Sequence, residues 1–339
     1  MKTNGPLLLS AAIMLASCHS MVVENVITSL PHETKNGEII FEVPAGQREN
    51  VYVVEGNICS VYKRGMNDYV LEIMSMDDTS QVVNLIPFGE GEDAMMLVAC
   101  YVSDSRILVE DIVQKKYAVV DVMAVQWGAR RKIEMASLSL LTQEMVPMDD
   151  EKIMYLNPGS FRSREPRFYV VGPKGSGRKL SKNGQKSLNV LKGSLLYNPQ
   201  KNCVAFLSRH TPEIEFYGAE NKSLRRKLTI ERDEVVEIAE VFSGVIKEYL
   251  FKNKVPVCFM AGTSDDERIV AAYRDEHAQM HLLSFDWDGS LEGGFAVNGD
   301  VWSVSVCDNY VYCWERGEEH DRLVRYDIRQ CEIINICNN

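Results

Sequence analysis

The sequence predicts an all-β fold, namely a six-bladed β-propeller with one short helical insertion. Six pairs of short apolar runs begin at residues 52, 107, 153, 204, 269 and 310, and a polar turn joins the members of each pair. Their average spacing is about 52 residues, which exceeds one hairpin and is typical of a four-stranded propeller blade. The runs are rich in β-branched and aromatic residues, which favour strands.

The chain length agrees with six blades. The chain has 339 residues, and 322 remain when 17 residues with the features of a signal peptide are set aside at the N-terminus. Six blades of about 52 residues need roughly 310 residues. The length therefore favours six blades over seven or eight.

The expected strands follow in chain order. They lie at 52–54, 61–62 and 69–71; 107–109 and 117–120; 153–155 and 168–171; 204–207 and 214–217; 269–273 and 281–285; and 310–312 and 323–326. Residues 280–328 are interpreted as one whole blade, with alternating apolar positions between turn residues. Residues 38–43 have no partner in the repeat. Because a terminal strand closes a propeller ring, we expect 38–43 to pair near 323–328.

One segment departs from the pattern of strands. Between residues 231 and 250, apolar residues fall at Val235, Ile238, Phe242, Val245 and Tyr249. Steps of three and four predict a helical stripe. The alternative is two irregular strands, because Gly244 interrupts the segment and β-branched residues are common in it.

The N-terminus has the order of an export signal. Lys2 precedes an apolar run at 7–15, which is too short to cross a bilayer, and Leu15-Ala16-Ser17-Cys18 follows. These four residues resemble the lipobox of bacterial lipoproteins, which implies that Cys18 is acylated and becomes the first mature residue. An ordinary signal peptide with a chance cysteine is the alternative. We expect a signal peptide at 1–17, a lipidated tether at 18–35 and the propeller at 36–339.

The composition limits the classes of partner and indicates the redox state of the cysteines. The net charge is -11, which disfavours binding to nucleic-acid phosphates. Besides Cys18 the chain has eight cysteines, and most lie inside apolar runs, where a thiol behaves as a small core residue. We expect most of the eight to be unpaired, with Cys331 and Cys337 as the best candidates for a disulfide bridge.

Three segments carry a family resemblance. Residues 86–92 read Ile-Pro-Phe-Gly-Glu-Gly-Glu and lead into the hairpin of 107–122, and 263–273 and 284–290 combine polar turns with strands. Together they resemble the TolB-like six-bladed propeller lipoproteins of Gram-negative gut bacteria over roughly residues 40–330. The resemblance implies a fold and a place in the cell envelope, without a general catalytic set. Residues 19–24 lack the acidic run associated with surface export in such bacteria. This favours the outer membrane facing the periplasm, with surface display as the alternative.

Candidate cofactor and metal motifs are incomplete. Residues 172–179 are glycine-rich but lack the final Gly-Lys-Ser/Thr of a phosphate loop. Asp286 and Asp288 have the spacing of a calcium loop whose later ligands are missing, so a β-turn is expected. His277 reads as turn and His281 as strand, about 13 Å apart and too far for one ion. We therefore expect no cofactor, no metal site and no catalytic residues.

A basic cluster is unusual on this acidic chain. Between 162 and 186 Glu165 is the only acidic residue. The cluster could bind polyanionic glycan, lipid headgroups or an acidic partner, or it could be a solvated loop. Its candidate residues are Arg162, Arg164, Arg167, Lys174, Arg178 and Lys179.

The sequence therefore favours a lipid-anchored, non-catalytic binding or scaffold module with a protein or glycan ligand. The alternative is a propeller hydrolase or lyase acting on envelope carbohydrate. A polar cluster in the central channel would favour the enzyme, and a broad surface built by loops would favour the module.

Overall fold

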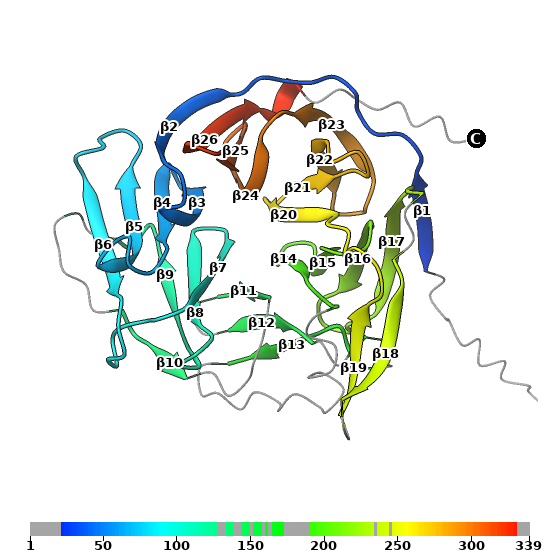
Figure 1. Cartoon of the computed structure of the whole chain (residues 1–339), viewed down its shortest axis with the longest axis horizontal. Helices are drawn as coiled ribbons and strands as arrows, with labels where there is room; N and C mark the ends of the chain where they lie inside the picture. The colour runs from blue at the N-terminus through cyan, green and yellow to red at the C-terminus, as the bar shows by residue number, and fades with distance from the viewer. Residues whose placement is uncertain are drawn as a thin grey trace, which may run out of the picture.

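The structure, a computed structural model, is a six-bladed β-propeller, as the sequence predicts (Figure 1). It describes residues 22–125, 127, 133–137, 144–149, 152–157, 160–161, 165–172, 190–233, 236–243 and 246–330. The strands of each blade run antiparallel and succeed one another from the central axis outward. All six expected hairpins are present as neighbouring strands.

The six blades follow one another in chain order. Blade 1 contains β3 (Arg48–Val54), β4 (Asn57–Tyr62), β5 (Tyr69–Ser75) and β6 (Val82–Pro87). Blade 2 contains β7 (Val98–Ser103), β8 (Arg106–Asp111), β9 (Lys116–Asp121) and β10 (Ala136–Ser137). Blade 3 contains β11 (Met145–Pro147), β12 (Ile153–Leu156) and β13 (Phe168–Val171).

The second half of the ring completes the circle. Blade 4 contains β14 (Gly193–Asn198), β15 (Cys203–Ser208), β16 (Glu213–Gly218) and β17 (Leu224–Ile230), with β1 (Val23–Ile27) added in parallel at its outer edge. Blade 5 contains β20 (Phe259–Ser264), β21 (Arg268–Arg274), β22 (Met280–Asp286) and β23 (Leu291–Val297). Blade 6 contains β24 (Asp300–Cys307), β25 (Tyr310–Arg316) and β26 (His320–Asp327), with β2 (Glu38–Pro44) outermost.

The apolar core is divided among the blade interfaces. Among the described residues the buried side chains form six clusters, and each cluster joins two neighbouring blades. Between blades 6 and 1, for example, Trp314 and Leu323 pack with Val51 and Val53. A single twisted sheet would leave these faces in water, so each blade depends on its neighbours.

The N-terminal segment closes the ring. Strand β2 pairs antiparallel with β26, from Glu38 opposite Arg325 to Pro44 opposite His320, which confirms the predicted closure. Before it, Ala296 of blade 5 exchanges two backbone hydrogen bonds with the same segment, accepting from Lys35 (3.0 Å) and donating to Glu33 (2.8 Å). The stretch expected to be a tether at 18–35 therefore contacts the propeller from β1 onward.

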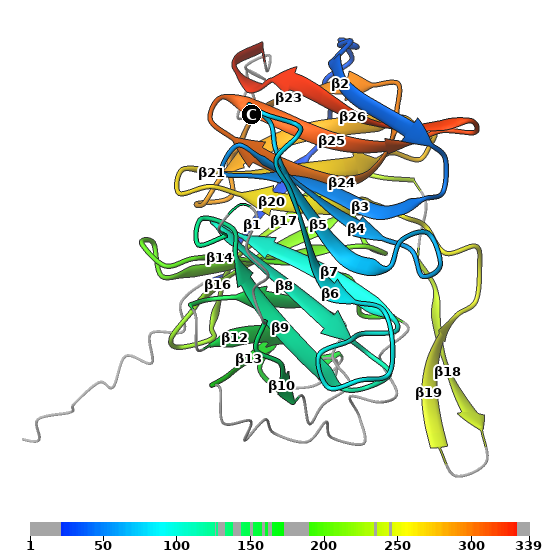
Figure 2. The same ribbon diagram turned by 90° about the vertical axis from the view of Figure 1, so that its left-hand side faces the viewer.

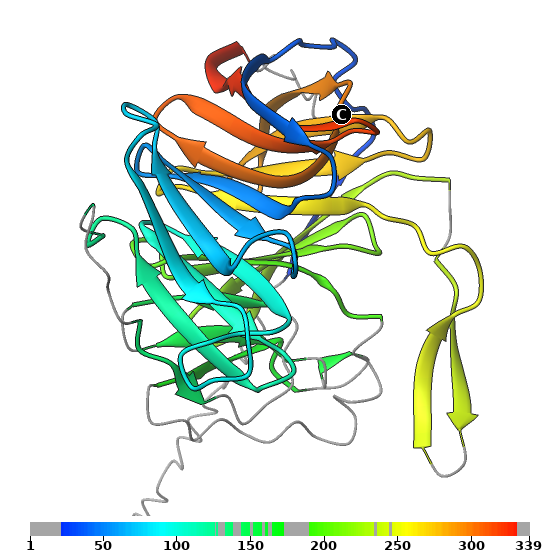
Figure 3. The ribbon, with the colours of Figure 1, turned by 60° about the vertical axis from the view of Figure 1, so that its left-hand side comes forward.

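The helix expected between residues 231 and 250 is wrong, and the alternative of two strands is correct. Strands β18 (Ile238–Ser243) and β19 (Ile246–Phe251) form an antiparallel hairpin. This hairpin is part of the connection between blades 4 and 5, and it extends away from both blades (Figures 2 and 3). At its base the Phe251 ring packs edge-on against His210, with centroids 4.9 Å apart. The apolar residues of this segment are spaced by three and four positions, which is also typical of a helix, but its β-branched residues favour strands.

The interpretation of residues 280–328 as one blade is also wrong. Strands β22 and β23 are the outer strands of blade 5, whereas β24, β25 and β26 are the inner three strands of blade 6. The boundary shifts because blade 6 takes its outer strand, β2, from the other end of the chain.

Most cysteines are thiols, as expected. Cys59, Cys100, Cys203, Cys258, Cys307 and Cys313 carry no disulfide bond, and all but Cys307 are buried. Cys331 and Cys337 lie outside the described residues. No helix in the described part of the chain is long and apolar enough to cross a membrane.

Candidate binding site in the central channel

The innermost strands of the six blades surround a central channel. Strands β3, β7, β11, β14, β20 and β24 all end at the same face of the ring, where short turns connect them to the second strands. A cavity of about 430 Å³ opens there, and every blade contributes to its lining. Its walls include Val54, Val102, Met148, Tyr197, Thr263 and Val306. We call this cavity the mouth.

Acidic side chains dominate the polar part of the mouth. Glu55, Asp104 and Asp308 are the first residues of the turns that follow β3, β7 and β24, and all three are exposed. Each has a left-handed backbone, with φ of 49°, 54° and 55°. Aspartate tolerates this conformation better than most residues do. The same turn geometry in three blades thus places three carboxylates on one rim.

The other charged residues of the mouth have structural partners. Asp265 accepts hydrogen bonds from the backbone amides of Glu267 (2.8 Å) and Arg268 (2.7 Å), which fixes its turn. Asp266 accepts from Gln200 Nε2 at 2.6 Å. Arg106, the one basic lining residue among those the structure describes, lies 3.7 Å from Asp104. Accessible carboxylates, those of Glu55, Asp104, Asp266 and Asp308, therefore outnumber the one described base of the mouth.

A second cavity, of about 220 Å³, continues along the channel. It shares Val102 and Thr263 with the mouth, and we call it the inner cavity. Tyr52, Glu144 and Arg209 are among its lining residues. Burial raises the pKa of Glu144 to about 8, although the backbone amide of Gly193 and the charges of Arg209 and Lys192 act in the opposite direction. Glu144 is therefore largely protonated at neutral pH.

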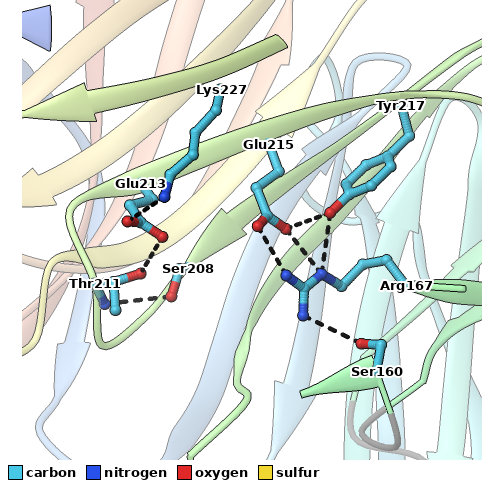
Figure 4. Close-up of polar contacts among 8 residues, drawn as sticks. All are labelled: Ser160, Arg167, Ser208, Thr211, Glu213, Glu215, Tyr217 and Lys227. Carbon is cyan, nitrogen blue, oxygen red and sulfur yellow. Dashed lines mark hydrogen bonds and ion pairs between the residues drawn. The ribbon is translucent and has the colours of Figure 1, made fainter. Parts of the chain in front are cut away.

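Arg167 of the predicted basic cluster belongs to a polar network between blades 3 and 4 (Figure 4). Its guanidinium donates to both oxygens of Glu215 at 2.8 and 2.7 Å, to the Tyr217 hydroxyl at 3.1 Å and to Ser160 Oγ at 3.1 Å. These contacts hold the Arg167 side chain against blade 4. Arg162, Arg164, Lys174, Arg178 and Lys179 lie outside the described residues, so the surface cluster stays a prediction.

The remaining sequence candidates have ordinary surroundings. His277 is exposed in a turn, whereas His281 is buried on β22 with Nε2 3.1 Å from Asp275 Oδ2. Residues 286–290 form a β-turn, in which the Gly289 amide donates to the Asp286 carbonyl at 3.0 Å. No group of three or more metal-ligating side chains occurs within the described ranges. Cys18 and residues 173–179 lie outside those ranges.

Sequence reasoning missed the mouth carboxylates, although a signal for them existed. The pairs Glu55-Gly56, Asp104-Ser105 and Asp308-Asn309 each follow a predicted or observed inner strand directly. Once strand order is known, these turns must share one face. Glu144 and Arg209 had no such signal, because they come from different blades and meet only in the folded channel.

The fold and the channel define a six-bladed β-propeller with an open, acidic mouth. No family model matches the chain, and no curated protein matches it. Among solved structures, a protein from Bacteroides fragilis described as exported aligns with a TM-score of 0.51 and 10% identity, covering 90% of this chain and 99% of its own. A member of the DUF4221 family from Bacteroides vulgatus aligns with a TM-score of 0.51 and 11% identity, covering 87% and 99%. At such identities the likeness extends to the fold alone.

Proposed function

We propose that this protein is a lipid-anchored module of the cell envelope, of the TolB-like propeller kind, which binds a partner at the mouth without catalysing a reaction. The observation that supports this is the mouth itself. All six blades contribute to one open cavity of about 430 Å³. A rigid ring with a cavity at one end of its channel presents a preformed surface to a partner.

The charge of the mouth favours a cationic partner. Glu55, Asp104 and Asp308 are exposed carboxylates on one rim, and Arg106 is the nearest base. Complementary charge raises the rate and the specificity of association. A basic segment of a protein therefore fits this site better than an anionic glycan, which the rim would repel.

The proposed location rests on Cys18. Acylation there would attach the module to the membrane surface, with the outer membrane facing the periplasm as the preferred site. A single acyl chain gives only marginal attachment, whereas the several chains of a lipoprotein anchor hold firmly. One structural neighbour is described as exported, which is in keeping with this proposal.

Calorimetric titration of the mature chain with an oligolysine peptide tests the binding role. The variant Glu55→Gln/Asp104→Asn/Asp308→Asn removes three rim charges, each worth roughly 0.5 kcal/mol, so affinity should fall about tenfold. The matched control Glu90→Gln/Glu92→Gln/Glu318→Gln removes three exposed charges away from the mouth and should bind as the wild type does. Equal losses in both variants, or no saturable binding by the wild type, would contradict the proposal.

The inner cavity favours one alternative function. Glu144, with its pKa near 8, lies among Arg209, Tyr52 and Tyr101, and such a protonated carboxyl can serve as a general acid. A carbohydrate hydrolase or lyase is therefore the second candidate. Turnover of envelope polysaccharides that Glu144→Gln abolishes, with binding retained, would establish it.

A further inference from the structure

The start of the N-terminal segment is held firmly against the propeller. Strand β1 pairs in parallel with β17 over five residues, from Val23 opposite Arg226 to Ile27 opposite Ile230. Ile27 is buried in the core between blades 4 and 5, and the amide of Glu231 donates to its carbonyl at 2.8 Å. The segment that would connect a lipid to the domain is thus part of the fold from residue 23 onward.

Strand β1 lies along the rim of the ring. It is the fifth strand outward in its sheet, beyond β14, β15, β16 and β17. Neighbouring strands are rotated by about 20–25°, so four steps turn β1 by roughly 90° relative to the inner strand. Four spacings of about 4.8 Å also place it roughly 19 Å outside that strand. Figure 1, viewed down the short axis of the molecule, shows β1 lengthwise at the outer edge.

The chain between Cys18 and this rim is short. Five residue steps separate Cys18 from Val23, and each spans at most about 3.6 Å, so the reach is at most about 18 Å. A lipid on Cys18 would therefore keep the outer edge of blade 4 close to the headgroups. A long flexible linker would place no such restriction on the domain.

The exposed side chains of this edge suit a bilayer surface. Val22, Val23 and Val26 are 36%, 46% and 60% exposed. Arg226, opposite Val23 on β17, is partly exposed and can contact lipid phosphates. The mouth, in contrast, presents Glu55, Asp104 and Asp308, which anionic headgroups repel.

We infer that the propeller stands on its rim, with the outer edge of blade 4 on the membrane and the channel axis roughly parallel to the bilayer plane. The inference rests on the acylation of Cys18 in the proposed function. It gives the mouth a defined position, opening sideways and roughly 20 Å or more above the headgroups. The partner must then present its basic segment at that height, either from the aqueous phase or from the extramembrane part of a membrane protein.

Paramagnetic relaxation in nanodiscs tests the orientation. The mature acylated chain, with labelled valine methyl groups, is placed in discs of phosphatidylethanolamine and phosphatidylglycerol that contain a headgroup nitroxide lipid. Val23 and Val26 should relax several-fold faster than Val82 and Val113, which are matched controls with 39% and 58% exposure on blades 1 and 2. Uniform relaxation, or faster relaxation at Val82 and Val113, would overturn the inference.

A second variant separates orientation from attachment. A Gly-Ser insert of about ten residues after Met21 lengthens the greatest reach by about 36 Å. The chain should remain attached to the discs while the difference between Val23 and Val82 disappears. A difference that persists with the insert would show that the short linker does not set the orientation. A mature N-terminus whose mass shows no acyl chains would instead refute acylation and thus the proposed anchor, whatever the orientation.

Discussion

The substitution Glu144→Gln should remove most of the loss of stability that the wild-type protein shows between pH 6.5 and pH 8. In the folded protein the pKa of Glu144 is raised to about 8 by burial, against an ordinary value of 4.5. The folded state therefore binds this proton more tightly than the unfolded state does. The free energy of unfolding falls as pH rises from about 4.5 to about 8.

The size of the effect follows from the pKa difference. Between pH 6.5 and pH 8 the unfolded state gains about 2 kcal/mol from ionisation of this carboxyl, while the folded state gains about 0.4 kcal/mol. The wild type should thus lose about 1.6 kcal/mol. Burial lowers the pKa of His210, which reduces stability below about pH 7 in the wild type and in Glu144→Gln alike, so comparison of the two proteins removes this effect.

Urea unfolding followed by tryptophan fluorescence at the two pH values measures this difference. Glu144→Gln should lose less than about 0.5 kcal/mol over the same interval. Glu318→Gln, an exposed control, should behave as the wild type does. If Glu144→Gln keeps the full pH dependence, the carboxyl is not desolvated in the channel and the description of the inner cavity is wrong.

Four further predictions concern the fold and the anchor. Deletion of residues 36–44 removes the strand that closes blade 6, so the melting temperature of the whole domain should fall, and an unchanged value in calorimetry would refute closure. Cys18→Ala should release the protein from membranes, which detergent partitioning and the mass of the mature N-terminus would reveal. Thiol titration in denaturant should find at least six reactive groups, whereas three or four mapped disulfides would contradict the core role of these cysteines. Arg167→Met should cost about 2 kcal/mol in urea unfolding because it leaves the partly buried carboxylate of Glu215 without its cation, and Arg167→Met/Glu215→Met should recover part of this loss.

The strands and the closure could be predicted because they depend on local patterns. Short, mostly apolar runs bounded by turn residues, such as 269–273 and 281–285, identify buried strands, and the members of each predicted pair are neighbouring strands of one blade. Residues 38–43 were recognisable because they had strand character without a partner in the repeat. A ring needs one strand of that kind to close.

Other features depend on partners that are distant in sequence. Residues 238–251 satisfy both a helical and a strand spacing, and only the hairpin pairing of Ile238 with Phe251 decides between them. Strand β1 is short and mostly exposed, so its sequence gives little indication that it pairs with β17. The inner cavity brings together Glu144 and Arg209 from two blades, and no spacing rule relates them.

The position of the bound probe tests the central proposal most directly. Methyl resonances of the mature chain can be followed during titration with the oligolysine peptide. The proposal predicts shifts at Val54, Val102 and Val306, which line the mouth, and none at Val82 on the outer strand of blade 1 or Val113 in the turn between β8 and β9. Shifts confined to the outer edges, with the mouth resonances unchanged, would show that the mouth is not the binding site.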